Sequence, residues 1–413
     1  MWLVACGGPI AAADPAAGPT VVSAQPVSDW KLSGSASVKE TFDSNVYLQS
    51  ETPQANRESL VTSLLPQAAL AWHPSPVFHA NLTYAPEITF FHSESSEDFV
   101  AHRLTLALTG KNQKTAYEST TSLTFIDGSS FGPTWTGLGG APATGGPTVR
   151  DRRDAAVYRS SFRVTQNLGK WFVRPVFSFY LHDFQTEQRA TPGYQNYVDR
   201  HELLGGLDLG WRLTDNLAAW TGYRYGIQDQ ARLLAFPEEY DNTFHRALVG
   251  VEGQPAKWLK LSLALGPEFR RYGDHVPVSF GDRDEVNFFV DASLTLSLLR
   301  DDTLALSVKQ FHQPGFGGRS TYADLTYDLT WKHQCNKRWA TGLGGRAYNT
   351  DFHKPIVRND WVLSANAFVN GAINSRLSAE LSYVYEVGLT RDPNASGREY
   401  ERHLLAAGLK FNF

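Results

Sequence analysis

Apolar and polar residues alternate along most of this chain, which is the pattern of β-strands whose two faces meet different surroundings. In 320–332, Leu325 and Tyr327 share one face, while Asp324 lies on the other, and 377–389 repeats the arrangement. About eighteen such segments occur, with about sixteen as the alternative, and most reach the roughly 9 to 11 residues that a tilted transmembrane strand needs. They lie near 31–42, 62–73, 78–91, 99–110, 115–127, 155–166, 171–184, 200–213, 217–230, 243–253, 258–272, 285–299, 303–312, 320–333, 339–349, 359–371, 377–390 and 400–413.

The connections between these segments are alternately short and long. Tight turns such as 73–76, 167–170 and 214–216 are built from residue types that turns favour. Longer polar loops such as 43–58 and 128–154 lie between them. Short turns on one side and longer loops on the other are typical of bacterial outer-membrane barrels, which have an even number of antiparallel strands. The sequence therefore predicts an all-β fold, a closed antiparallel transmembrane β-barrel with short periplasmic turns and longer extracellular loops.

The last segment alternates up to the final residue. Its apolar face includes Leu405, Leu409, Phe411 and Phe413. A barrel is completed when its last strand pairs with its first. We predict that Leu409, Phe411 and Phe413 form a C-terminal assembly signal, through which the barrel-assembly machinery recognises the chain.

Composition narrows the class of protein. The chain has 413 residues, a net charge of −4 and 42% hydrophobic residues, and no run approaches the roughly 20 apolar residues of a membrane-spanning helix. No basic excess points to nucleic acid, which we do not expect as a partner. Its two cysteines cannot form a disulfide framework.

The chain divides into three parts. Residues 1–13 are short, apolar and rich in small residues, which indicates the remnant of a signal peptide, although a basic start is missing. The alternative is that Leu3 to Cys6 form a lipobox and that Cys6 is lipidated. Residues 14–29, rich in Ala, Pro and Val, form a predicted periplasmic lead-in, and 30–413 form the barrel.

Tryptophans gather where the pattern places short turns. We predict that they form an aromatic girdle at the periplasmic interface, because tryptophan is enriched at membrane–water boundaries. The alternative is that they are ordinary core aromatics at strand ends. The girdle residues are Trp30, Trp72, Trp171, Trp211, Trp258, Trp331 and Trp339.

The inward-facing charges are the candidates for function. The predicted pore-lining basic residues are Arg103, Arg159, Arg163, Arg174, Arg224, Arg246, Lys260 and Arg270, and the acidic ones are Asp291, Asp324, Asp328, Glu380 and Glu386. The first set comes from earlier strands than the second, so a basic wall facing an acidic wall would create a transverse field across the pore. The alternative is that mixed charges solvate a water-filled lumen through local ion pairs.

The loop 128–154 is unusual because 131–147 carries no charge and three arginines follow. A loop of this length is either functional or disordered. We consider inward folding, which would make it a constriction loop. The candidate residues are Phe131, Trp135, Arg150, Arg152 and Arg153.

No motif for enzymatic chemistry accompanies these features. Histidines near the long-loop ends, such as His102 and His245, lack a Gly-x-Ser-x-Gly partner, and no His-Glu-x-x-His or Cys-x-x-Cys spacing occurs. We predict neither an enzyme nor a cofactor nor a metal site. Inward aromatics such as Tyr180 and Trp220 are either packing residues or a sugar slide.

The start of the barrel resembles a known family. Val38 to Leu48 reads VKETFDSNVYL, and Leu64 to Leu70 reads LLPQAAL. This resembles the opening of β-barrel porins that include those associated with exopolysaccharide loci, where an Asp-Asn-aliphatic-aromatic strand end precedes a second strand with a proline. The resemblance covers two strands by motif and implies a barrel, without identifying a substrate.

The sequence thus predicts a bacterial outer-membrane channel for passive diffusion of small hydrophilic solutes. Its expected partners are outer-membrane lipids, lipopolysaccharide, the assembly machinery and the solutes. The alternatives are a barrel that secretes or anchors exopolysaccharide and, third, an outer-membrane lipase with a serine–histidine pair on the lipid-facing wall.

Overall fold

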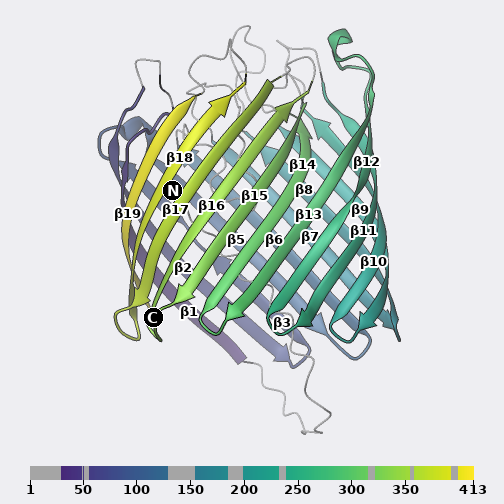
Figure 1. Ribbon diagram of the computed structural model, residues 1–413, viewed down its shortest axis with the longest axis horizontal. Helices are drawn as coiled ribbons and strands as arrows, with labels where there is room; N and C mark the ends of the chain where they lie inside the picture. Colours follow the sequence, from purple (N-terminus) through teal and green to yellow (C-terminus); the bar gives the residue numbers. More distant parts are fainter. Residues whose placement is uncertain are drawn as a thin grey trace.

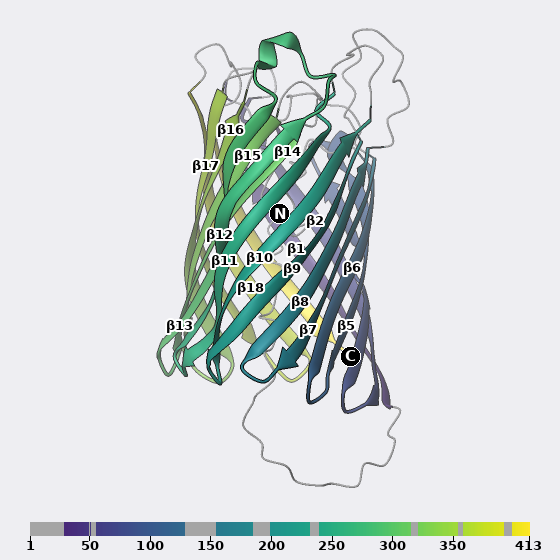
Figure 2. The same cartoon turned by 90° about the vertical axis from the view of Figure 1, so that its right-hand side faces the viewer.

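The chain folds into one closed antiparallel β-barrel (Figures 1 and 2), seen here in a computed structural model. The structure describes residues 29–48, 50, 55–128, 154–184, 199–231, 239–314, 321–353, 358–391 and 399–413. The described connections at one end of the barrel are short turns, and those at the other end are longer. We call these the short-turn end and the long-loop end. No helix within the described ranges is long and apolar enough to span a membrane.

Nineteen strand segments form the barrel wall. They are β1 (Asp29–Asp43), β2 (Ser59–Ser75), β3 (Phe78–Tyr84), β4 (Glu87–Phe91), β5 (Phe99–Lys111), β6 (Thr115–Gly128), β7 (Ala155–Leu168), β8 (Trp171–Asp183), β9 (Arg200–Thr214), β10 (Leu217–Gln230), β11 (Asn242–Ala256), β12 (Leu259–Tyr272), β13 (Asp284–Leu299), β14 (Asp302–Pro314), β15 (Thr321–Gln334), β16 (Trp339–Phe352), β17 (Arg358–Ala372), β18 (Leu377–Thr390) and β19 (Tyr400–Asn412). Two short 3-10 helices, η1 (Ser95–Glu97) and η2 (Val278–Phe280), lie in long-loop connections, and the loop with η2 projects beyond the rim (Figure 2).

The wall has eighteen strand positions, because β3 and β4 share one. Both segments pair with β2 on one side and β5 on the other. They are separated by Ala85 and Pro86, and proline has no N–H to donate to a strand ladder. The predicted closed barrel of about eighteen strands is therefore confirmed, and the segment predicted at 78–91 is one spanning strand with a break.

Closure joins the two ends of the barrel sequence. β1 pairs with β19 from Ser35 opposite Asn412 to Asp43 opposite Leu404. The last residue continues the ladder, because the N–H of Phe413 donates to the carbonyl of Gly34 and the N–H of Gly34 donates to the carbonyl of Phe413, both at 3.0 Å. The side chains of Leu409, Phe411 and Phe413 are exposed on the outer surface. This closure leaves no sheet edge at the junction of the two ends.

Side chains alternate between an apolar outer face and a polar inner face. Outward residues in mid-barrel are large and exposed, as with Leu207 and Phe162. Their neighbours along the strand, Asp208 and Ser161, point inward. An apolar belt around a polar interior is the pattern of a β-barrel that lies in a lipid bilayer.

This two-faced wall leads to a prediction on one strand. In β7, Phe162→Arg places a charge on the lipid face, and we expect it to lower the free energy of unfolding by about 2–4 kcal/mol. Ser161→Arg, one residue away at the same depth, points into the lumen and is the matched control. Urea unfolding in lipid vesicles measures both variants. Equal losses for the two arginines would contradict the assignment of the faces.

Adjacent strands pair over most of their lengths, with one long interruption between β13 and β14. Their ladder runs from Leu299 opposite Asp302 to Asp291 opposite Lys309 and then stops. β13 continues to Asp284 in register with β12, and β14 continues to Pro314 in register with β15. The wall therefore has a seam between β13 and β14 in its long-loop half.

Candidate functional site

The inner face carries the predicted lining charges. The structure places all of them at inward positions of their strands, opposite in parity to the exposed apolar residues. The basic ones are Arg103, Arg159, Arg163, Arg174, Arg224, Arg246, Lys260 and Arg270, and the acidic ones are Asp291, Asp324, Asp328, Glu380 and Glu386. Inward parity makes them candidates for the lining of a lumen.

Carboxylates lie next to the basic residues, so the structure favours the local ion-pair interpretation over two opposed walls. Arg103 pairs with Glu87 at 2.6 Å between neighbouring strands. On the side predicted to be acidic, Asp328 pairs with Arg346 and Glu380 pairs with Lys39. Each side thus contains its own counterions, which weakens a net field across the lumen.

Asp208 of β9 is the centre of the most buried mid-barrel cluster. Arg174 of β8 donates to it at 2.8 Å, and Arg224 of β10 lies 2.6 Å from its other oxygen. Arg174 also pairs with Glu252 of β11 and lies over the ring of Trp220, 5.2 Å from the centroid. Asp208, 1% exposed, thus bridges two guanidinium groups, Glu252 supplies the second negative charge, and the ring of Trp220 lies beside both guanidinium groups.

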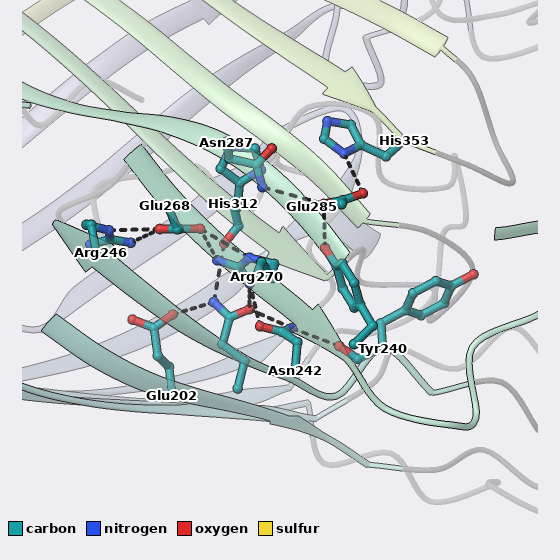
Figure 3. A network of polar contacts seen from close by, with 12 residues as sticks. Glu202, Tyr240, Asn242, Arg246, Glu268, Arg270, Glu285, Asn287, His312 and His353 are labelled. Carbon is teal, nitrogen blue, oxygen red and sulfur yellow. Dashed lines mark hydrogen bonds and ion pairs between the residues drawn. The ribbon is translucent and has the colours of Figure 1, made fainter. Parts of the chain in front are cut away.

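A larger polar network lies nearer the long-loop end (Figure 3). Glu268 of β12 binds Arg246 of β11 through one oxygen and Arg270 through the other. Arg270 also donates to Asn242 at 2.6 Å and to Gln228. These groups are all buried, and each guanidinium has a carboxylate or amide partner.

The same network reaches strands that are not neighbours in the wall. The amide of Gln228 on β10 donates to the backbone carbonyl of His312 on β14 at 3.2 Å. Glu285 on β13 lies 3.4 Å from the Nδ1 atom of His353, which follows β16 (Figure 3). At the same end, Arg200 of β9 lies beside the hydroxyls of Tyr180 and Tyr322, and Tyr322 belongs to β15. Polar contacts therefore cross the interior of the barrel in its long-loop half.

The interior differs between its two ends. Inward residues of the short-turn half, such as Ser262, Lys332 and Glu380, are exposed. Inward residues of the long-loop half, such as Asp324 and Tyr348, are fully buried. The lumen is therefore open toward the short-turn end and narrowed toward the long-loop end.

The segment that follows β1 forms a clasp at the closure. Asp43 accepts hydrogen bonds from Arg402 of β19 and, at 3.0 Å, from the backbone N–H of Asn45. The side chain of Asn45, fully buried, donates to the carbonyl of Glu401 at 3.0 Å. Tyr47 packs with Val46 and donates its hydroxyl to Glu94 at 2.7 Å.

The clasp gives a physical role to the residues that carry the family resemblance. Burial, with the Glu94 carboxylate as acceptor, raises the pKa of Tyr47, so its hydroxyl stays a donor. Sequence reasoning singled out Asp43, Asn45 and Tyr47 as a motif but did not connect them with β19. The inward parity of Arg402 and Asp43 on two strands that must meet at closure was the available signal.

The remaining predicted site residues have these places. The seven girdle tryptophans, Trp30, Trp72, Trp171, Trp211, Trp258, Trp331 and Trp339, lie at or next to the short-turn ends of strands, and two pairs of them face each other across strands with ring centroids 5.1 and 4.3 Å apart. The candidate constriction residues Phe131, Trp135, Arg150, Arg152 and Arg153 lie outside the described residues. The narrowing described above is formed by residues of the wall strands.

Histidines on the outer face bond to side chains of neighbouring strands. His102, His245 and His403 each bond a tyrosine hydroxyl, at 2.8, 2.5 and 2.7 Å. His92 bonds Thr62, and His201 pairs with Asp229. Among the residues described, no group of three or more His, Cys, Asp or Glu side chains could hold a metal ion.

Comparisons with known proteins give only distant similarities among solved structures. No protein-family model matches the chain, and no curated protein matches its sequence. Among solved structures, the chain is similar to OccAB4 of Acinetobacter baumannii, with 11% identity over 93% of this chain and 98% of that one at a TM-score of 0.45. It is also similar to opdK of Pseudomonas aeruginosa, with 8% identity, 93% and 99% coverage and a TM-score of 0.44. The siderophore receptor PirA of Pseudomonas aeruginosa is 9% identical over 94% of this chain and 81% of that one, with a TM-score of 0.41.

These similarities are too low to carry an argument about solutes. The closed even-stranded barrel, its apolar belt and its unequal connections define the architecture of an outer-membrane β-barrel by themselves. The resemblance of the first two strands to exopolysaccharide-associated porins has no support from a family match and stays a prediction.

Proposed function

We propose that the protein is an outer-membrane channel through which small hydrophilic solutes diffuse. The observation that carries the proposal is the polar inner face of a closed wall with eighteen strand positions. Barrels of 16 to 18 strands leave an aqueous channel, whereas smaller barrels are filled by side chains. A wall of this size, open at its short-turn end, gives water and solutes a path into the membrane-spanning region.

The local ion pairs indicate what kind of solute fits. Guanidinium and carboxylate groups alternate along the wall, as in the cluster of Arg174, Asp208 and Arg224. Such a surface offers donors and acceptors to polar solutes of either sign and excludes apolar ones. We therefore propose weak ion selectivity, with a preference for small polar molecules.

The two other candidate functions lack a supporting observation. Nothing in the described residues favours exopolysaccharide secretion over diffusion. For a lipase, the relevant groups are the outward histidines. Their side-chain partners are tyrosine, threonine or an acid, as with His245 and Tyr223. The lipase alternative requires a serine nucleophile beside such a histidine, and these partners are not serines.

Planar lipid bilayers test the proposal. Refolded protein is expected to give stepwise, ohmic conductance with a small reversal potential under a salt gradient. The control is the same preparation heated until its folded electrophoretic band disappears. Folded, inserted barrels that never conduct, in any variant described below, would overturn the channel function.

A further inference from the structure

On one side of the seam, the long-loop ends of β14 and β15 lie inside the barrel. The outward face of β14 includes Leu306 and Val308. His312 lies four residues after Val308, and because side chains alternate along a strand, it belongs to the same face. Yet His312 is only 8% exposed and lies within electrostatic reach of Glu268 and Arg270, which are inward residues of β12. The outer face of β14 therefore packs against the inner face of the neighbouring wall.

β15 shows the same displacement. Its outward positions Tyr327 and Leu329 are exposed in mid-barrel, but Thr321 and Ala323, of the same parity, are buried. Thr321 lies beside the hydroxyl of Tyr272, an inward residue of β12. We call residues 310–314 of β14 and 321–324 of β15 the inner flap.

The inner flap has contacts on both of its faces. The backbone carbonyl of His312 accepts from Gln228. On the outer face of the flap, the imidazole ring of His312 lies 5.6 Å from that of His353. On its inner face, Tyr322 lies beside Arg200 of β9. The flap thus stands between β8–β9 and β10–β13, where it narrows the lumen.

The inner position of the flap leaves β13 with an open sheet edge at the seam. Residues 284–290 of β13 have no strand partner on the β14 side. An open sheet edge that faces lipid leaves backbone N–H and C=O groups unsatisfied, each at a cost of several kcal/mol, and is therefore avoided in membranes. Phe288 and Val286, 52% and 72% exposed, show that this edge lies in the apolar belt.

The alternation of inward and outward residues also allows a second position of the flap, in which β14 pairs with β13 along its whole length. The ladder that ends with Asp291 opposite Lys309 would, if continued, place His312 opposite Phe288 and Gln310 opposite Val290. His312 and Phe288 both belong to outward faces, so the continued pairing needs no change of register. In that position His312 would join the other outward histidines of the long-loop end, such as His245 and His403.

We propose that the inner flap is a gate built from the barrel wall. It has two positions: an inner one held by Gln228 and Arg200, and a wall position in which β14 pairs with β13. Both positions satisfy polar groups, one through side chains and the other through the backbone ladder, which makes the element bistable. The wall position removes the contacts that cross the lumen and seals the seam, so the channel conducts more. The gate rests on the proposed channel function.

Disulfide trapping tests the gate, in a background in which both cysteines, Cys6 and Cys335, are serine. Phe288→Cys with His312→Cys joins outward positions that face each other only in the wall position, because the inner flap places them on opposite sides of β13. Pro267→Cys with Phe288→Cys is the matched control, since these residues are already paired between β12 and β13. Tyr272→Cys with Thr321→Cys, joined by a short bismaleimide that spans the length of the lost tyrosine side chain, holds the inner position.

We expect the 288/312 pair to crosslink on oxidation and the 272/321 pair to crosslink with the bismaleimide, as judged by mass spectrometry of peptides from the folded band. The wall-position crosslink is expected to raise single-channel conductance several-fold over the inner-position crosslink, with reversal by reductant. A control pair that crosslinks while the 288/312 pair never does would overturn the gate. If the 288/312 variant does not fold, Gln228→Ala, which removes the side chain that holds the His312 carbonyl in the inner position, serves instead, and unchanged conductance in that variant would overturn the gate. Crosslinking does not depend on conduction, so a gate that moves in a silent barrel would refute only the channel.

Discussion

Asp208→Asn is expected to destabilise the barrel by about 3–5 kcal/mol, because removing one partner of a buried ion pair leaves an uncompensated charge. Asp208 is 1% exposed and serves both Arg174 and Arg224. Asparagine keeps the shape and removes the charge, so two guanidinium groups remain with only the Glu252 carboxylate nearby. The same change makes the inner face more positive. We therefore also expect the reversal potential under a salt gradient to shift toward anions.

Asp328→Asn is the matched control for this variant. Its pair with Arg346 is also on the inner face, but the two side chains are 32% and 26% exposed. Solvated pairs of this kind contribute only about 0–1 kcal/mol. Urea unfolding in vesicles and bilayer reversal potentials compare the two variants. Equal loss of stability in both would show that the Asp208 cluster is not a buried anchor of the wall.

Arg402→Gln is expected to destabilise the closed barrel by a similar amount, about 3–5 kcal/mol, through a different part of the wall. Arg402 of β19 binds both oxygens of Asp43 on β1, and Glu386 of β18 lies 3.9 Å from it. All three groups are buried. Without the guanidinium, two buried carboxylates face each other at the strands that close the barrel. We expect loss of the compact band on unheated gels at a lower urea concentration.

Lys39→Gln tests whether the loss of any ion pair near the closure destabilises the barrel, or only the loss of the pair between Asp43 and Arg402. Lys39 of β1 pairs with Glu380 of β18 near the same junction, at 3.2 Å, but Glu380 is 51% exposed. We expect its loss to cost no more than about 1 kcal/mol. Asn45→Ala in the Arg402→Gln background gives a double-mutant cycle. Contacts within one clasp should be non-additive. Additive losses would mean that Asp43, Asn45 and Arg402 act independently.

Strand positions were predictable because a barrel wall has a simple physical rule. Lipid outside and polar groups inside force a period of two, and the turns need residues that reverse the chain. The predicted segments 217–230 and 377–390 coincide with β10 and β18, and most others differ by a few residues at the ends. Inward parity of Arg174 or Asp324 follows from the same alternation. Only the break at Pro86 within 78–91 was not anticipated.

Charge partners were less accessible, because they depend on which strands adjoin and at what register. The basic residues come from earlier strands than many of the acidic ones, which suggested two walls. The pairing of β8 with β9 and of β9 with β10 instead places Asp208 between Arg174 and Arg224. Alternation predicts on which face of the wall a side chain lies but not its height along the barrel axis. An ion pair forms only between side chains that share the face and lie at a similar height.

The sequence by itself determined the barrel, its strand order and the face of each side chain, because these depend on local periodicity and on chain connectivity. Only the tertiary structure decided the clasp of Asp43 on Arg402, the seam beside β13 and the position of the inner flap. These features join residues far apart in sequence. In the flap, alternation also fails to predict burial, because His312 is at an outward position of its strand and yet lies buried inside the barrel. Periodicity cannot signal such a displacement, because a strand keeps its alternation wherever its neighbours allow it to lie.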